Sequence, residues 1–258
     1  MENFAIIIPT RGDRPKFLEQ CKKLISRQTL QPKGIIWMDY APEGPHKDIT
    51  QRYRRGVEQA HQQRYEFVVF MEDDDWYHPQ YLEWLIGKWK AKNKPDFFGV
   101  GETYYYHHAI DGLQHMVHLK RTSMFCTLAK LPWRISYPRD SNPFLDMHIF
   151  KHAQVVTIPF PKDTVYAIGI KHGIGKTGGS GHTSHSQYKL GGNKKWFYKH
   201  VGTDSKFYDS MLDEMKAPIY TRKNNNVPKI NAVPRRKIVA INSHIQSSKK
   251  SIRGIRRK

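Results

Sequence analysis

The sequence predicts an α/β fold, in which a mostly parallel central sheet is flanked by helices and followed by a basic C-terminal extension. Over residues 4–95, short apolar runs alternate with segments whose apolar residues recur at helical spacing. The 258 residues, 38% of them hydrophobic and 12% aromatic, are enough to form one core of ordinary size. Residues 216–258 hold 13 Lys and Arg and no Asp or Glu. We therefore expect one domain over residues 1–215 and a basic tail over residues 216–258.

The first part of the chain contains three strand-like runs, and each is followed by a helical pattern. A continuous apolar run is typical of a parallel strand that is buried on both faces. Strands are expected over residues 4–8, 34–39 and 65–71. Helices are expected after Pro15, over residues 48–61 and after Pro79. Alternating strands and helices require crossover connections, so the strands are expected to be mostly parallel.

The pattern changes after residue 96. Further strands are expected over residues 97–107, 113–119, 155–160 and 165–170. The dipeptide Asp111-Gly112 is a hairpin-turn signal between the first two of these. Helices are expected over residues 145–152 and 196–214. Residues 173–193 contain seven glycines and are expected to form a loop.

Polar side chains follow the ends of the first three expected strands. Residues 9–11 (PTR) follow the first strand, Asp39 ends the second, and residues 72–75 (EDDD) follow the third. Because the carboxyl ends of parallel strands lie along one edge of a sheet, these residues are expected to be neighbours in space. Ligands of open α/β sheets bind at that edge.

Four adjacent acidic residues after a strand repel one another unless solvent or a cation offsets their charge. Hard divalent cations prefer carboxylate oxygens and often bridge substrate phosphates. Residues 72–75 therefore indicate a metal–diphosphate site, and a solvated acidic loop or the N-terminus of a helix is the alternative.

Residues 70–82 (FMEDDDWYHPQYL) resemble the DxD region of family 2 glycosyltransferases, whose usual pattern is F-L-D-x-D-D-W-x-x-P-x-Y-L. The opening residues 6–11 (IIIPTR) resemble the first strand of that family. Residues 35–39 (IIWMD) resemble its second strand, whose aspartate faces the nucleotide base. The resemblance covers residues 4–95 well and residues 96–172 loosely, and it implies the GT-A fold, a Rossmann-like sheet.

The resemblance implies a metal-dependent transfer from a nucleotide-diphosphate sugar, with a UDP-sugar as the expected donor and Mn²⁺ or Mg²⁺ as the metal. Asp74 and Asp75 are then expected to bind the metal, and Glu72 stands where the family has its first aspartate. The remaining donor-binding residues are expected to be Pro9, Thr10, Arg11, Asp39, Asp73 and Lys176, with Lys171 as a further phosphate neighbour. The family ending Asp-Asp-Gly-Ser after the second strand is replaced here by residues 39–42 (DYAP).

Inverting members of the family use a carboxylate to deprotonate the acceptor hydroxyl. Residues 144–150 (FLDMHIF) resemble the segment that carries it, which makes Asp146 the expected catalytic base and Asp140 its competitor. His172 follows a late strand, as does a metal-binding histidine in many GT-A enzymes, so it is a third expected metal ligand. His182 and His185 are weaker candidates.

The formal net charge of +20 favours a polyanionic partner. Basic residues interleaved with aromatic ones suit nucleic acid, and we expect Trp76, Trp133 and Arg134 to bind the acceptor. The acceptor is expected to be a hydroxymethylated pyrimidine in double-stranded DNA, because some bacteriophages glycosylate such bases. A tail that only aids solubility is the alternative to a DNA-binding tail.

Three other functions fit parts of the sequence. A cell-envelope glycosyltransferase that extends a lipid-linked saccharide or lipopolysaccharide would dock its basic tail on anionic lipid. A non-catalytic nucleic-acid-binding protein would retain the fold without turnover. A nuclease would use the acidic cluster for two-metal cleavage, but it gives no role to residues 9–11 or Asp39.

The sequence also predicts the compartment. Two cysteines, Cys21 and Cys126, cannot form a disulfide framework or a four-ligand zinc site. No apolar run approaches the roughly 18–20 residues that span a membrane, and the N-terminus lacks the basic region of a secretory signal. A cytoplasmic location is expected, in the host cytoplasm if the protein is phage-encoded.

Overall fold

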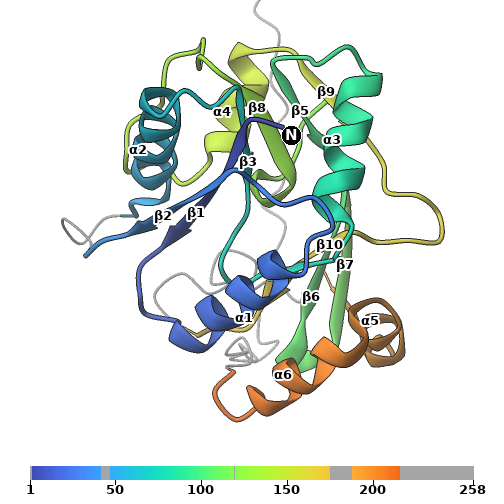
Figure 1. Ribbon diagram of the computed structural model, residues 1–258. Helices are drawn as coiled ribbons and strands as arrows, with labels where there is room; N and C mark the ends of the chain where they lie inside the picture. The colour runs from blue at the N-terminus through green and yellow to red at the C-terminus, as the bar shows by residue number, and fades with distance from the viewer. Residues whose placement is uncertain (1, 42–46, 119, 175–187, 216–258) are drawn as a thin grey trace, which may run out of the picture. The chain divides into compact units, whose positions relative to one another are not determined.

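The computed structural model describes residues 2–41, 47–118, 120–174 and 188–215. Within these residues the chain forms two mixed β-sheets with helices packed against them (Figure 1). The first sheet has six strands in the order β2-β1-β3-β8-β5-β9, and the second has five in the order β11-β7-β6-β10-β4. The expected basic tail lies outside the described residues.

The strands of the two sheets are interleaved along the chain. The first sheet consists of β1 (Phe4–Thr10), β2 (Gly34–Asp39), β3 (Phe67–Phe70), β5 (Phe97–Val100), β8 (Thr127–Lys130) and β9 (Val155–Ile158). The second consists of β4 (Trp76–Tyr77), β6 (Glu102–His107), β7 (Gly112–Val117), β10 (Ala167–Lys171) and β11 (Lys189–Leu190). The helices are α1 (Pro15–Ser26), α2 (Ile49–Gln62), α3 (Tyr81–Ala91), α4 (Leu145–His152), α5 (Lys194–Val201) and α6 (Ser205–Ser210). None of these helices is both long and apolar enough to cross a bilayer.

Alternate residues of β1 enter two different hydrophobic clusters. Ile6 and Ile8 pack in the cluster that contains α1 and α3. Ile7 packs in the cluster that contains α2 and α4. The central strand is thus buried on both faces, as its continuous apolar run predicts. Helix α2 lies close to β1 at Gly56, where a Cβ would stand 2.6 Å from Ile7 Cγ2.

The first sheet is mixed, but three of its five strand pairings are parallel, so the expectation of a mostly parallel sheet fails only at β8. Strand β1 pairs in parallel with both β2 and β3, as the alternation of strands and helices predicts. Strand β8, however, lies between β3 and β5 and pairs antiparallel with both. The sequence does not indicate β8 as a strand, because its four residues form too short a run to show a period.

Two expected elements are each divided at a glycine. The strand expected over residues 97–107 is two strands, because β5 belongs to the first sheet and β6 to the second. They meet at Gly101, where a Cβ would lie 2.7 Å from His118 O. The helix expected over residues 196–214 is divided at Gly202, whose φ of +58° ends α5 before α6 begins.

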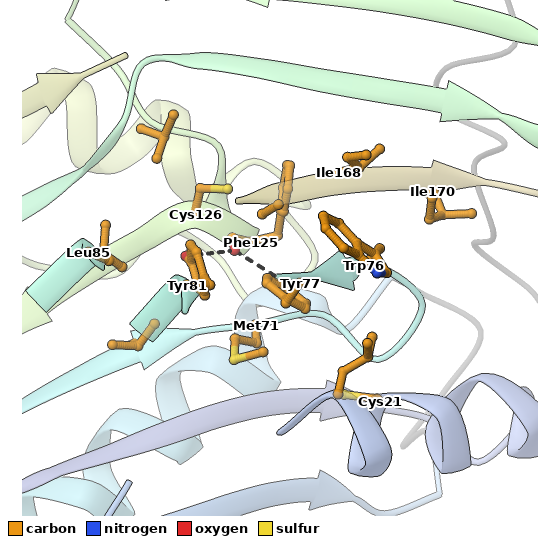
Figure 2. Packing of buried hydrophobic residues seen from close by; sticks show 14 of the residues in the cluster. Cys21, Met71, Trp76, Tyr77, Tyr81, Leu85, Phe125, Cys126, Ile168 and Ile170 are labelled. Carbon is orange, nitrogen blue, oxygen red and sulfur yellow. Dashed lines mark hydrogen bonds between the residues drawn. The ribbon is translucent and has the colours of Figure 1, made fainter. Parts of the chain in front are cut away.

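A buried aromatic cluster lies between the two sheets and supports the acidic segment (Figure 2). Tyr77 and Tyr81 donate hydrogen bonds to the carbonyl oxygen of Phe125, at 3.3 and 3.4 Å. The Tyr77 hydroxyl also accepts the backbone N–H of Glu72 at 2.8 Å. One buried phenol therefore fixes where the acidic segment begins. Cys21 and Cys126 lie in the same cluster and are both free thiols.

Candidate active site

The acidic segment, residues 72–75, connects β3 of the first sheet to β4 of the second. At its end, Asp75 Oδ1 accepts the backbone N–H of Ile170 in β10 at 2.7 Å. On the other side, Tyr53 of α2 donates its hydroxyl to Glu72 Oε1 at 3.0 Å. The segment is therefore fastened to both sheets and to α2, which holds its carboxylates at the carboxyl end of β3.

The two central carboxylates of the acidic segment are buried and paired with cationic or hydrogen-bonding groups. Arg14, the residue before α1, forms a fork in which one nitrogen contacts Asp74 Oδ2 and the other lies 2.5 Å from Asp73 Oδ1. His172 Nε2 lies 2.9 Å from the same Asp74 oxygen, and its Nδ1 accepts the N–H of Ile174 at 3.0 Å. Because Nδ1 is an acceptor, the proton of the neutral imidazole is on Nε2 and points at Asp74.

Burial sets the protonation of this cluster. It raises the pKa of Glu72 and of Asp75, and the neighbouring Asp74 charge raises both further. Burial also raises the pKa of Asp73 to about 7, although the Arg14 guanidinium opposes the shift. For Asp74, burial favours the protonated form, but Arg14 and His172 outweigh it and hold its pKa below the usual range. The cluster gathers more carboxylates than its arginine and histidine neutralise.

The donor set of the acidic segment fits a hard divalent cation. Glu72, Asp74 and Asp75 each offer a carboxylate oxygen, and these oxygens lie within 4.8 Å of one another. Asp75 Oδ2 is buried and has no hydrogen-bond partner among the described residues. A buried carboxylate oxygen without a donor is costly, and a cation at this point would satisfy it.

A cavity of about 450 Å³ opens over this segment. Its wall includes the end of β1, the acidic segment, the start of α4 and the end of β10. Among the residues that line it are Pro9, Arg11, Arg14, Glu72, Asp73, Asp74, Met116, His118, Arg121, Phe144, Asp146, Met147 and Lys171. The volume is within the range of cavities that hold small molecules. Parts of the chain as far apart as residues 9 and 171 thus meet around one space.

Arg11 is a cation in the wall of this cavity whose side chain is almost fully buried. Its side chain is 7% exposed, and its Nε lies 3.3 Å from Asp48 Oδ1. None of its three guanidinium nitrogens makes a hydrogen bond within the described part of the chain. Lys171 also lines the cavity, with its Nζ 4.9 Å from the centre of the Tyr105 ring. These two cations are suited to an anionic ligand that supplies the missing acceptors.

Asp146 lies on the opposite wall of the cavity, in the first turn of α4. Arg121 forms an ion pair with its Oδ2 and also lies 2.9 Å from His118 Nδ1. Asp140, the competing candidate, is not part of the cavity wall. Arg54 of α2 holds it through two hydrogen bonds of 3.1 and 2.9 Å.

The structure brings some of the expected site residues into the cavity and leaves others outside it. Pro9, Arg11, Glu72, Asp73, Asp74 and Asp146 line it. Thr10, Asp75 and His172 are buried just behind this wall, and Asp39 is the register partner of Thr10 on β2. Lys176, His182 and His185 lie outside the described residues.

The three residues expected to bind the acceptor do not line the cavity. Trp76 is buried and donates its indole N–H to Asp204 Oδ2 at 2.9 Å. Trp133 packs against Phe97 and stacks on Tyr137. Arg134 is exposed, 3.9 Å from Asp96. The side chains near Asp146 that do line the cavity are instead Met116, His118, Arg121, Phe144 and Met147.

Several arginines of the site were missed by the sequence analysis. Arg52 of α2 is fully buried and donates to the carbonyl oxygens of Thr10 and Met38, at 2.6 Å each, which ties the ends of β1 and β2 together. Arg14 and Arg121 reach their carboxylates across 60 and 25 residues of sequence. Only the position of Arg14, directly before the proline at which α1 begins, could have pointed to one of these arginines.

Comparisons with known proteins give distant structural similarities. The chain is similar to the S. aureus TarS 1–349 structure in complex with UDP, at 11% identity and a TM-score of 0.44, over 67% of this chain and 61% of that one. The UDP-GlcNAc complex of the same protein gives 12% identity and a TM-score of 0.45, over 83% and 71%. A glycosyltransferase involved in glycosylation of the major capsid of PBCV-1 gives 10% and 0.38, over 71% and 95%.

The match to the UDP complex spans about three fifths of the TarS fragment. No family model matches the sequence, and no curated protein matches it. Similarity at this level does not assign an activity, so a functional interpretation depends on the residues of the site.

Proposed function

We propose that this protein is a metal-dependent glycosyltransferase of the GT-A type that uses a nucleotide-diphosphate sugar, with UDP as the expected nucleotide. One observation carries the proposal: a buried carboxylate cluster faces the same cavity as the Arg11 guanidinium, which makes no hydrogen bond among the described residues. A metal–diphosphate needs carboxylate oxygens on the metal side and cations on the phosphate side. The likeness of residues 70–82 to the DxD region supports the same assignment.

The residues divide into roles by position. Glu72, Asp74 and Asp75 would hold the metal, which when bound supplies positive charge to the leaving diphosphate. Arg11 and Lys171 would bind the phosphate oxygens from the cavity wall. The Pro9–Arg11 turn and Asp39 would face the nucleoside, because they end the neighbouring strands β1 and β2.

Asp146 is the proposed base. The bond between the sugar C1 and the diphosphate oxygen breaks as the acceptor oxygen bonds to C1 from the opposite face, which inverts the configuration. Asp146 accepts the proton from the acceptor hydroxyl. Its carboxylate is paired with Arg121 in this structure, so Arg121 has to release it, and the pair is shallow enough for water or an acceptor group to replace the contact.

For the acceptor we propose a hydroxymethylated pyrimidine in double-stranded DNA. The net charge of +20 and the 13 basic residues of 216–258 favour a polyanion. Near Asp146, the side chain of Phe144 lines the cavity, and the residue is 60% exposed. An exposed aromatic ring beside the proposed base suits stacking with a base that has been flipped out of the duplex.

The deciding experiment supplies the full chain with Mn²⁺, a panel of nucleotide sugars, and duplex DNA with or without hydroxymethylated pyrimidines. We expect release of the nucleoside diphosphate and a sugar mass increment on the modified nucleoside. Release without a DNA adduct would retain the glycosyltransferase and reject the DNA acceptor. A lipid-linked saccharide and anionic vesicles would then be tested. No release with any donor would reject the proposed function.

A truncation tests the role of the tail in acceptor binding. Deleting residues 217–258 is expected to weaken DNA binding and to lower its dependence on salt, because fewer phosphate contacts release fewer counterions. Donor hydrolysis should be retained, because the cavity is built by residues 9–171. Unchanged DNA affinity would assign the tail a role in solubility only.

A further inference from the structure

We propose that Arg14 is an exchangeable counter-ion of the acidic segment. It neutralises Asp73 and Asp74 while no divalent cation is bound, leaves Asp74 when a cation binds, and then contributes its charge to the phosphates of the donor. The last step rests on the proposed function. The exchange itself depends only on the carboxylates and the guanidinium.

Arg14 contacts a carboxylate that belongs to the candidate cation set. Asp74 is a member of the three-carboxylate set, and the Arg14 fork occupies its Oδ2. That same oxygen also receives the Nε2 proton of His172 at 2.9 Å. A carboxylate oxygen has about two lone-pair positions, so a metal that coordinates Asp74 through Oδ2 has to displace one of these two donors.

His172 is held more firmly than Arg14. Its ring is completely buried, stacks on Phe17 with ring centres 4.2 Å apart, and accepts the N–H of Ile174. Arg14 instead lines the cavity, and its Nε has no hydrogen-bond partner among the described residues. The guanidinium is therefore anchored mainly by the two carboxylates, and it is the donor that a competing cation would displace.

The exchange also suits the charge of the incoming ligand. When a divalent cation replaces the Arg14 guanidinium at Asp74, the released positive side chain stays in the cavity that Arg11 and Lys171 also line. In the free protein Arg14 pairs with Asp73 and Asp74. When a diphosphate enters the cavity, Arg14 pairs with the diphosphate instead. Binding of the cation and of the diphosphate would then favour each other, and the coupling would be reciprocal.

The first test measures Mn²⁺ binding alone, by calorimetry on the full chain, for the wild type, Arg14→Gln and Arg14→Lys. Arg14→Gln is expected to bind Mn²⁺ at least about tenfold more tightly, because the competitor is gone. Arg14→Lys keeps the charge but cannot form the fork, so its affinity should fall between the two. The control is Arg27→Gln at the other end of α1, whose arginine pairs with Asp204 and is 41% exposed; it should match the wild type.

The second test measures UDP binding at saturating Mn²⁺. Arg14→Gln is expected to bind UDP about tenfold more weakly, although it binds Mn²⁺ more tightly. This opposite pair of shifts would not arise from a loosened site, which would weaken both. If wild-type protein binds Mn²⁺ but neither it nor the variants bind a nucleoside diphosphate, the proposed function fails while the exchange at Asp74 is still tested by the first experiment.

Two results would overturn the proposal. One is an Arg14→Gln variant that binds Mn²⁺ no more tightly than the wild type. The other is an Arg14→Lys variant that binds Mn²⁺ with wild-type affinity. That result would mean that the positive charge at residue 14 repels the metal, and that the Arg14 fork is not displaced from Asp74. If Arg14→Gln does not fold, Arg14→Lys decides the question alone by the same comparison. A rise in the melting temperature of either variant on adding Mn²⁺, larger than that of the wild type, is a further expected result.

Discussion

The two walls of the cavity each present a carboxylate paired with an arginine, but at different depths. On the wall formed by the acidic segment, the Asp74 and Arg14 side chains are 7% and 9% exposed. On the opposite wall, Asp146 and Arg121 are 15% and 21% exposed. Because Asp146 and Arg121 are more accessible to water, we expect their contact to be replaced more easily than that of Asp74 and Arg14. The difference suits a carboxylate that must exchange protons on one wall and one that must hold a positive charge on the other.

The largest expected effect comes from neutralising one carboxylate on each wall. Asp74→Asn is expected to abolish metal-dependent turnover together with Mn²⁺ binding. Asp146→Asn is expected to lower turnover by roughly 10²–10⁴-fold, because a general base contributes about that much, and to leave UDP binding unchanged. Steady-state rates and calorimetric UDP binding separate the two. Asp140→Asn is the control for Asp146, and full activity of Asp146→Asn would disprove its assignment as the base.

Removing Arg14 is expected to lower the free energy of unfolding more than removing Arg121. Arg14→Gln leaves Asp73 and Asp74 buried without a counter-ion and should lower the free energy of unfolding by about 3–5 kcal/mol in the absence of divalent cations. Arg121→Gln should cost about 1 kcal/mol or less, because Asp146 stays partly hydrated. Urea unfolding in chelator measures both. Equal costs would mean that the depth of the two walls does not distinguish them.

A smaller effect is expected from the phenol that fixes the acidic segment. Tyr77→Phe leaves the buried N–H of Glu72 without its acceptor, and it should cost about 1–3 kcal/mol. It should also weaken Mn²⁺ binding, because Glu72 is a member of the carboxylate set. Tyr198→Phe is the matched control, since that hydroxyl bonds the more exposed Asp209. A Tyr77→Phe variant with normal metal affinity would show that the segment keeps its position without this bond.

The smallest effect is expected for an ion pair at the surface. Arg54 and Asp140 have side chains that are 28% and 41% exposed, and they form two hydrogen bonds. Arg54→Gln should change the free energy of unfolding by about 0.2–1 kcal/mol and leave Mn²⁺ affinity unaltered. This change in the free energy of unfolding is the baseline for the Arg14–Asp74 and Arg121–Asp146 pairs of the cavity. A cost as large as that of Arg14→Gln would show that exposure is a poor guide to these pairs.

Local patterns predicted the first three strands and helices well, because the strands are short apolar runs that end at polar residues or proline and the helices follow them in alternation. The expected range 34–39 is β2, and the expected range 145–152 is α4. Sheet pairing was harder to predict. Antiparallel β8 joins β3 to β5 through contacts between distant residues, and no period within its four residues indicates that position.

For the site as well, features that depend on local patterns were predicted and contacts between distant residues were not. The rule that parallel strands end at one edge correctly placed Pro9, Arg11 and residues 72–74 around one cavity. It could not indicate Arg14 or Arg121, because their partners are set by how α1 and the segment before β8 pack. A lone arginine in sequence carries no sign of the carboxylate it will meet. The acceptor residues Trp76, Trp133 and Arg134 stay predictions, placed by the structure away from this cavity.

The end of strand β10 and the residue after it lie against the acidic segment and its cavity. The Ile170 amide bonds Asp75, Lys171 enters the cavity, and His172 bonds Asp74. The Ile170 amide proton thus touches a carboxylate of the expected metal set without being a ligand itself. The chemical shift of the Ile170 amide proton and its rate of deuterium exchange should therefore change when the charge of the carboxylate cluster changes. The fold therefore provides a built-in spectroscopic reporter for the cluster that needs no label and no substitution.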